Sequence, residues 1–351
     1  MPRLRSQQPV RSIVQACSRF ETGSRKTVPT CVRTSAMAYY LGVDGGGTKT
    51  RCVLANETAV LADAMTGGCS VLRVGEQQAR ESLHSAIRQV CARAKISPDH
   101  IHAVCVGATG AARPEIAAKV RAILAELIPE SPTTKIELVG DHVIALEAAF
   151  GSRPGVIVIA GTGSIAYGRD DAGVVARAGG WGFAISDEGS GQWLGRRVVS
   201  TILDAYDHGL ESVLTSMVLE EWKLTTIDEL VQHANSTPPP EFPRLFPLLL
   251  RAGGQGDPAA RGLLFDGGVK LANLAATVVH RLAPPSAGGM PPAKTLPLVP
   301  LPIAMTGSVF RQSADVRQAF YNTLQQVFPG IEVRPDLADP IEGALARAKR
   351  A

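Results

Sequence analysis

Residues 39–54 combine an acid, glycines and a hydroxyl in a spacing that could bind phosphate. An apolar run ends on Asp44, three glycines follow at positions 45–47, and Thr48 and Lys49 precede a second apolar run. Glycines permit positive φ and let backbone N–H groups approach a polyphosphate that side chains would keep away. Asp44 ends a strand that should be buried, where it is well placed to hold Mg²⁺ through water. The stretch therefore predicts a strand–turn–strand unit that binds nucleotide phosphates.

Two better-known phosphate-binding patterns do not fit this stretch. A Walker A loop requires Gly-x4-Gly-Lys-[Ser/Thr]; Gly42 and Gly47 have the right separation, but Thr48 precedes Lys49. The dinucleotide fingerprint requires a helix after the loop, and here a strand is expected. Taken alone, the stretch also fits a plain glycine-rich hairpin turn, so its interpretation depends on the rest of the chain.

Two further glycine–hydroxyl turns follow apolar runs. The run 155–160 leads into Gly161-Thr162-Gly163-Ser164, and the run 298–305 leads into Thr306-Gly307-Ser308. Asp141 ends another apolar run, between the first two turns. Two similar domains that face each other, each with such a turn, would clamp a nucleotide between them, with the third turn supporting the adenosine. Three turns in this order, with an acid between the first two, are far more specific than one.

The spacing of apolar residues predicts an α/β protein in which one pattern occurs twice. The first half reads as three strands followed by helix, strand, helix, strand and helix, and the strand with its glycine–hydroxyl turn recurs roughly 115 residues later. The second half carries a helical insertion over about 189–283 and an extended loop over 284–297. The expected strands are a hairpin within 39–54, then 60–65, 101–107, 135–139, 155–160, 165–168, 174–178, 298–305 and 331–334; the expected helices are 75–95, 114–127, 142–150, 257–282, 315–327 and 339–350.

Length and composition indicate a globular protein. The chain has 351 residues, 45% of them hydrophobic and 19% charged, enough for two domains that each bury a sizeable core. Its apolar runs are far shorter than the roughly 20 residues of a membrane span. The net charge of +4 arises in residues 1–36, which carry +6 and leave −2 for the remainder. Because that remainder has no basic excess, we expect no nucleic acid as a partner, and the short apolar runs argue against a membrane.

Residues 1–36 contain no apolar segment of the kind found in secretory signals. Their Arg- and Ser-rich character resembles a transit peptide, but a disordered leader, or a start codon assigned too far upstream, is the stronger expectation, because Met37 stands just before the first strand. The six cysteines show no CxxC spacing, and none lies beyond Cys105. We therefore expect reduced thiols in a cytoplasmic protein, without an iron–sulfur site or a disulfide framework.

Together these motifs resemble the sugar-kinase/Hsp70/actin superfamily and, more closely, the N-acetylglucosamine and glucosamine kinases of the BadF/BadG/BcrA/BcrD ATPase family. The resemblance implies a two-domain actin-like (ribonuclease H-like) fold with the nucleotide in the interdomain cleft. The N-terminal domain would be 37–141, completed by the C-terminal helix 340–351, and the C-terminal domain 142–339. The motifs that carry the resemblance are the 44–49 turn, Gly140-Asp141, the 161–164 turn, Gly179-Gly180-Trp181-Gly182, Ser186-Asp187-Glu188-Gly189-Ser190-Gly191 and Asp339-Pro340-Ile341-Glu342-Gly343-Ala344-Leu345.

The resemblance also implies roles for individual residues. Asp141 would be the general base that faces the sugar hydroxyl, and Asp187 would hydrogen-bond sugar hydroxyls. Phosphoryl transfer needs little covalent chemistry from the protein, so Mg²⁺, backbone N–H groups and one carboxylate can suffice. The nucleotide-binding residues would be Asp44, Gly45, Gly46, Gly47, Thr48, Lys49, Gly161, Thr162, Gly163, Ser164, Gly307 and Ser308; the substrate-binding residues would be Ser70, Asp141, Gly180, Trp181, Asp187 and Glu188.

Plainer interpretations stay open for several of these residues. Asp141 could cap the helix that follows it. Trp181 could be a core aromatic, and the acids 187–188 could be N-terminal charges on the next helix. Lys49 fits a solvated turn residue better than a phosphate ligand.

Two positions depart from the family pattern. N-acetylglucosamine kinases typically have an asparagine that contacts the sugar after the small residue in the loop following the third strand; here Ser70 is followed by Val71. This leaves glucosamine or another amino sugar open beside N-acetylglucosamine. His142 stands where a small residue is expected, and the sequence offers no physical reason for it.

We therefore expect an ATP-dependent kinase that phosphorylates the 6-hydroxyl of an amino sugar, with ATP, Mg²⁺ and Asp141 as base. The alternative is an ATPase that activates a partner enzyme, of the 2-hydroxyacyl-CoA dehydratase activator type. Those proteins hold an iron–sulfur cluster with cysteines in the second half of the chain, which this sequence lacks. A transcriptional regulator would need a helix-turn-helix before the first strand, and retention of Asp141 argues against a non-catalytic filament protein. A homodimer is left open.

Overall fold

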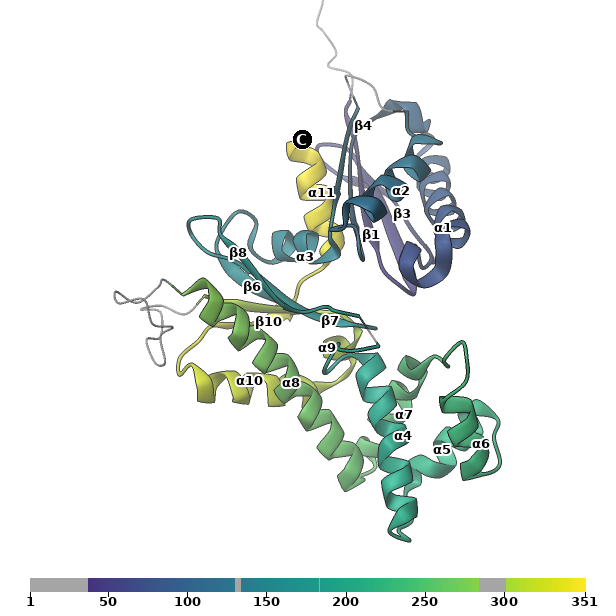
Figure 1. Ribbon diagram of the computed structural model, residues 1–351. Coiled ribbons are helices and arrows are strands. Elements are labelled where there is room, and N and C mark those ends of the chain that lie inside the picture. Colours follow the sequence, from purple (N-terminus) through teal and green to yellow (C-terminus); the bar gives the residue numbers. More distant parts are fainter. Residues whose placement is uncertain (1–36, 130–133, 183, 284–300) are drawn as a thin grey trace, which may run out of the picture. The chain divides into compact units, whose positions relative to one another are not determined.

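The structure is a computed structural model that describes residues 37–129, 134–182, 184–283 and 301–351. The predictions for the leader 1–36 and the loop 284–297 lie outside the described residues. Residues 37–351 form one compact unit. Two five-stranded sheets with helices packed against them give the α/β fold that the sequence predicted (Figure 1).

The first sheet has the strand order β3-β2-β1-β4-β5. Strand β1 pairs antiparallel with β2 across the predicted hairpin and parallel with β4, which in turn pairs parallel with β5. The elements of this half are β1 (Tyr39–Gly45), β2 (Lys49–Ala55), β3 (Val60–Gly67), α1 (Val71–Ala94), the short 3₁₀ helix η1 (Pro98–His100), β4 (Ile101–Ala108), α2 (Pro114–Ala125), β5 (Lys135–Val139) and α3 (Asp141–Phe150).

The second sheet has the order β8-β7-β6-β9-β10, which repeats the arrangement of the first. In both sheets three antiparallel strands precede two strands that run parallel to the first of them. This confirms the predicted internal repeat. The strands are β6 (Gly155–Ala160), β7 (Ser164–Arg169), β8 (Val175–Gly179), β9 (Ile303–Thr306) and β10 (Val333–Leu337).

Helices fill the predicted insertion between β8 and β9. They are α4 (Gly191–Asp207), α5 (Val213–Trp222), α6 (Ile227–Ala234), η2 (Phe242–Leu245), α7 (Phe246–Gly254) and α8 (Pro258–Leu282). After β9 follow α9 (Ser308–Gln312), α10 (Ala314–Val327) and, beyond β10, α11 (Pro340–Arg350). Of the strand predicted over 298–305, the first three residues lie outside the described residues, and β9 begins at Ile303. A short helix that the sequence analysis did not predict, α9, starts directly after Gly307.

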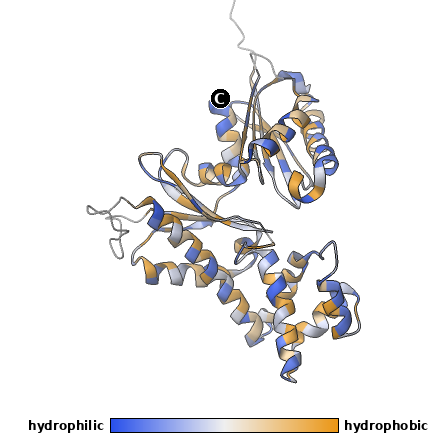
Figure 2. Cartoon of the chain, in the orientation of Figure 1, coloured by the Kyte–Doolittle hydropathy of each residue, from blue (hydrophilic) through white to orange (hydrophobic). Residues whose placement is uncertain are grey.

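Each sheet has its own hydrophobic core. Leu41, Leu83 and Ile87 belong to the first, in which α1 covers one face of the sheet. Helix α8 is long and apolar enough to cross a membrane by length and composition alone, and hydrophobic residues occur along its length (Figure 2). Its inward-facing residues, such as Leu271 and Val278, are fully buried in the second core against β6, β7 and α10. We therefore describe α8 as a core helix.

Candidate active site

Three parallel strands of the first sheet end at one edge and bring polar side chains together there. Because β1, β4 and β5 are parallel, Asp44, Thr109 and Asp141 come at corresponding ends. Thr109 Oγ1 donates to Asp141 Oδ2 at 2.7 Å, and the Thr109 N–H donates to the carbonyl of Gly45 at 3.0 Å. Thr109, at the end of β4, thus bonds both to Asp141 and to the backbone next to Asp44.

Asp141 is the first residue of α3, and Gly140 is the N-cap residue. The interpretation of Asp141 as the helix cap is therefore wrong. Its Oδ1 accepts a hydrogen bond from the backbone N–H of His142 at 2.9 Å, while Oδ2 takes the bond from Thr109. Burial acts to raise the pKa of Asp141, but the hydrogen bonds from His142 and Thr109 lower it, and the pKa lies below its ordinary value. The side chain is still 28% exposed, so part of the ionised carboxylate remains accessible from solvent.

Asp44 has the opposite electrostatic character at the same edge. Burial raises the pKa of its carboxyl to about 7, and repulsion from Asp141 and Asp339 adds to this effect, against the opposing influence of Lys49 and Arg51. An acid that is this costly to ionise becomes easy to ionise when a cation is bound beside it.

The residues at this edge fit a magnesium ion that is held mainly by other ligands. No cluster of three or more His, Cys, Asp or Glu residues suited to a metal occurs among the residues that the structure describes. Mg²⁺ commonly uses one or two carboxylates and completes its shell with waters and nucleotide phosphates. The half-buried Asp44 suits that arrangement, and a bound cation would offset both the burial and the neighbouring carboxylates that raise its pKa.

The first glycine turn is closed by a hydrogen bond from the Gly46 N–H to the carbonyl of Lys49 at 2.9 Å. The loop before α1 lies against it, since the Cys69 N–H donates to the Gly46 carbonyl at 3.1 Å. Ser70, in the same loop, is buried as the residue before α1. Lys49 starts β2 with an exposed side chain, in agreement with a solvated turn residue.

The second glycine turn is held by the start of α4. The Gly161 N–H donates to the carbonyl of Gly163 at 2.9 Å, which closes the turn. The N–H groups of Gly191 and Gln192 donate to the carbonyls of Gly161 and Thr162, at 2.8 and 3.2 Å. The first turn of α4 therefore fixes the backbone of the second glycine turn.

The two turns touch, and the third lies beside the second. Thr48 Oγ1 lies 3.0 Å from Thr162 Oγ1, a hydrogen bond between turns 114 positions apart in sequence. Gly307 has a φ of 106°, and a Cβ on it would overlap the backbone of Ala160, so only glycine fits there. Ser308 follows as the exposed first residue of α9.

Asp187 packs against the second turn. A Cβ added to Gly163 would lie only 2.8 Å from Asp187 Oδ2, so the carboxylate packs directly against this glycine. The backbone N–H groups of Ser164 and Gly182 donate hydrogen bonds to the carboxylate. Burial, together with the neighbouring Glu188, raises the pKa of Asp187. Its φ of 73° is a conformation uncommon for residues other than glycine.

The neighbours of Asp187 settle two open interpretations. The acids 187–188 are not charges in the first turn of α4, which begins at Gly191 and holds no acid there; Ser190 caps the helix, and its Oγ accepts from the Trp193 N–H at 3.1 Å. Trp181 is 60% exposed, with the guanidinium of Arg177 4.0 Å above its ring, so it is not a core aromatic. The backbone of the same loop is held in place by a bond from the Gly180 N–H to the Ser164 carbonyl at 2.9 Å.

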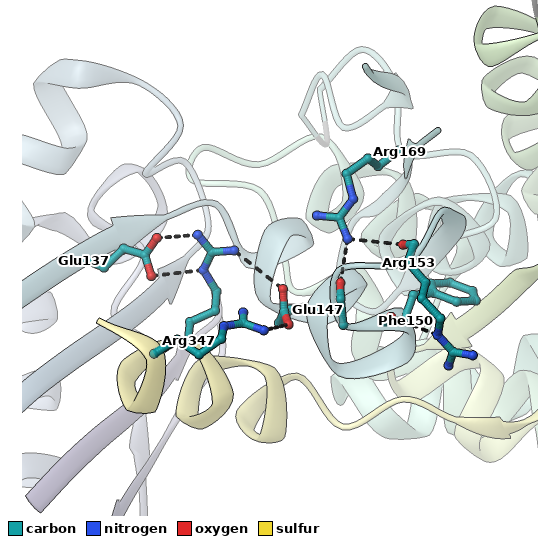
Figure 3. Close-up of polar contacts among 8 residues, drawn as sticks. Glu137, Glu147, Phe150, Arg153, Arg169 and Arg347 are labelled. Atoms are coloured by element: carbon teal, nitrogen blue, oxygen red, sulfur yellow. Dashed lines mark hydrogen bonds and ion pairs between the residues drawn. The ribbon is translucent and has the colours of Figure 1, made fainter. Parts of the chain in front are cut away.

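A network of charged side chains fixes the helix that carries Asp141. The buried carboxylate of Glu147 on α3 lies 3.7 Å from Arg347 (Figure 3), and it lies 2.7 Å from Arg350; both arginines are on α11. Arg347 also holds Glu137 on β5 through two contacts, one of them from its Nε at 3.0 Å. Helix α3 is thereby anchored both to α11 and to the sheet edge.

Sequence reasoning missed two polar residues near these groups. Thr109 could have been found as the hydroxyl directly after a buried strand. Arg73 lies against Gly47 and pairs with Glu241 at 3.5 Å. Its only sequence signal is a basic residue in the first turn of the helix that follows the loop.

The sequence of residues 41–348 matches that of the BadF/BadG/BcrA/BcrD ATPase family. The chain belongs to this family. An N-acetyl-D-glucosamine kinase from Dictyostelium discoideum is 29% identical over 88% of this chain and 97% of the relative. A glucosamine kinase from Vibrio cholerae is 30% identical over 65% of this chain and 76% of the relative.

A solved structure from Chromobacterium violaceum extends the similarity to three dimensions. That protein carries a provisional assignment as an N-acetylglucosamine kinase. It superimposes with a TM-score of 0.68 at 27% identity, over 88% of this chain and 98% of that one. The BadF/BadG/BcrA/BcrD assignment and the two-sheet fold therefore agree.

Proposed function

We propose that the protein is an ATP-dependent sugar kinase that phosphorylates the 6-hydroxyl of an amino sugar, N-acetylglucosamine or glucosamine. One observation carries this proposal: an ionised, partly exposed Asp141 lies at the same edge as Asp44, while the two phosphate-type turns meet at Thr48 and Thr162. A base for an acceptor hydroxyl and a cradle for a polyphosphate therefore occur in one molecule. The names of the relatives support a sugar as the acceptor.

In the proposed reaction the sugar hydroxyl oxygen forms a bond to the γ-phosphorus as the bond from that phosphorus to the bridging oxygen breaks. ADP leaves with the electron pair, and the hydroxyl proton passes to Asp141. Thr109 and the His142 N–H hold the carboxylate so that one oxygen can face the acceptor. Mg²⁺, when bound with the nucleotide, would neutralise phosphate charge, and Asp44 would help to hold it.

The remaining site residues take the parts that the family resemblance implies. Backbone N–H groups of the turns 45–48 and 161–164 would hold the phosphates, and 307–308 would lie near the adenosine. Asp187 would bond sugar hydroxyls, with Ser70, Gly180, Trp181 and Glu188 lining the sugar. Asp187, whose pKa is raised by burial, would accept hydrogen bonds from sugar hydroxyls in this part.

We also propose the domain division and cellular location expected from the sequence. The boundaries would lie at 141/142 and 339/340, with the nucleotide between the two domains. Cys52, Cys69, Cys91 and Cys105 are buried free thiols, which is compatible with a reducing cytoplasm.

The test is a coupled ADP-release assay with Mg-ATP against glucosamine, N-acetylglucosamine, glucose and N-acetylmuramic acid. We expect turnover with an amino sugar, and a fall in kcat of about 10²- to 10⁴-fold in Asp141→Asn, with the KM for ATP retained, because the variant loses the base alone. Asp171→Asn, on an exposed turn, is the matched control. Near-normal turnover of Asp141→Asn would overturn the base assignment. ATP hydrolysis without dependence on any sugar would favour an ATPase that drives a partner protein.

A further inference from the structure

His142, the residue without a reason in the sequence, joins the proposed base to the second sheet. Its imidazole Nδ1 lies 3.5 Å from Asp141 Oδ1, the oxygen that already accepts its backbone N–H. The other side of the ring meets Tyr167 on β7 edge-on, with the ring centroids 4.5 Å apart. The side chain is only 14% exposed. The ring therefore fills a fixed position between α3 and β7.

The position of the His142 ring matters because the strand that it contacts, β7, also carries part of the second glycine turn. Strand β7 begins at Ser164, the last residue of the second glycine turn, and Tyr167 lies three residues later. A ring that contacts both Asp141 and Tyr167 thus connects the acceptor side of the reaction with the strand that carries a phosphate turn. Thr109, the other side chain that contacts Asp141, lies at the end of β4 in the first sheet and does not make that connection among the described residues.

We propose that His142 is a positioning residue, which orients the carboxylate of Asp141 toward the acceptor hydroxyl and fixes its position relative to β7. This rests on the proposed kinase function and on Asp141 as its base. With a hydrogen on Nδ1, the imidazole directs a donor at Oδ1. A contact of 3.5 Å is long for a hydrogen bond, and catalytic hydrogen bonds that are long in the free enzyme shorten when substrate closes the site. The remaining lone pair of Oδ2 is then free to accept the proton of the acceptor hydroxyl.

Gly140 makes room for the ring. A Cβ on Gly140 would collide with Cε1 of His142, although the backbone of Gly140, at φ −65° and ψ 149°, suits any residue. The glycine is thus required by the neighbouring imidazole and not by its own conformation. This gives a way to move the ring without changing His142.

The first experiment separates the donor of His142 from its ring. His142→Asn keeps an N–H donor near the position of Nδ1 and loses the aromatic ring, while His142→Phe keeps a ring on Tyr167 and loses the donor. We expect His142→Phe to lower kcat about 10-fold with the KM for ATP unchanged, because a hydrogen bond to a charged group is lost. His142→Asn should retain most of kcat. His100→Phe, on exposed η1, is the matched control.

The second experiment is a double-mutant cycle between Gly140→Ala and His142→Ala. The extra methyl should reduce kcat strongly in the wild-type background and little when the imidazole is absent, which gives a clear coupling between the two positions. Thermal unfolding of each variant shows whether the effect is on folding instead.

The outcomes distinguish this inference from the function on which it rests. If wild type has sugar-dependent turnover but His142→Phe matches it, or if Gly140→Ala costs the same in both backgrounds, the positioning role is wrong and the kinase function stands. Equal losses in the Asn and Phe variants also overturn it, because they point to packing alone. If wild type shows no sugar-dependent turnover, the proposed function itself fails.

Discussion

Two carboxylates at one sheet edge are driven in opposite directions by their surroundings. Asp141 is held ionised by hydrogen bonds to both of its oxygens, whereas Asp44 has few compensating contacts and is pushed toward its protonated form by burial and by Asp141. Groups with such separated pKa values suit separate tasks, here a base and a cation ligand. The electrostatic state of Asp44 depends on Asp141, because the charge on Asp141 is a cause of the raised pKa of Asp44.

Asp44→Asn tests this description through stability. The folded-state pKa of Asp44, about 7, lies above its ordinary value of 3.8, so the native state binds the extra proton between these pH values and loses stability as pH rises through them. The variant should therefore be more stable than wild type by about 2 kcal/mol at pH 8 without nucleotide or Mg²⁺, and by less at pH 5. Urea unfolding at both pH values measures the difference. A difference that did not depend on pH would contradict the raised pKa.

At the scale of elements, α3 and α11 act as one support for the base. Gly343 of α11 has no room for a Cβ, which would overlap the carbonyl of Ile144, so the two helix backbones are in direct contact. The pairs of Glu147 and Glu137 with Arg347 then lock the helices to each other and to β5. Close packing sets the distance between the two helices, and the ion pairs set the position of one helix along the axis of the other.

Arg347→Met should destabilise the protein by about 3 kcal/mol at pH 7, because it leaves the buried Glu147 with one partner and Glu137 with none from α11. Lys349→Met, at an exposed position on the same helix where the amine donates to the carbonyl of Glu57, should cost under about 1 kcal/mol and is the matched control.

The pH dependence checks the cause of that loss. The hydrogen bond from Arg347 lowers the pKa of Glu137, so the stability gained from the pair is present above the unfolded pKa and disappears as pH falls through the folded one. The cost of Arg347→Met, measured by urea unfolding, should therefore shrink below about pH 4. A cost that stayed constant down to pH 3 would show that packing, and not charge, dominates.

At the scale of the whole molecule, residues 37–351 form a compact unit that contains every element of the candidate site. A chain that begins at Met37 should accordingly fold and phosphorylate the sugar with the kcat and unfolding temperature of the full chain. Side-by-side thermal unfolding and ADP-release assays measure both. Failure of the shorter chain to fold would show that residues 1–36 belong to the structure and that Met37 is not the natural start.

Local sequence determined the elements and the turns between them. Alternating and continuous apolar runs identified nearly all the strands, and the recurrence of strand and glycine–hydroxyl turn identified the repeat now visible in the two sheets. Asp44, Asp141 and the three turns were selected because each directly follows a buried strand. These are short-range properties, in which neighbours along the chain carry the signal.

Only the tertiary structure decided which of these residues meet. Thr109 touches Asp141 because β4 lies beside β5, Thr48 meets Thr162 from the other half of the chain, and His142 reaches Tyr167 on another sheet. The exposure of Trp181 was likewise settled by its surroundings and not by its flanking glycines. Burial, charge pairing and pKa depend on distances between strands and helices that are remote in sequence, so a motif can name the candidate groups while packing sets what each can do.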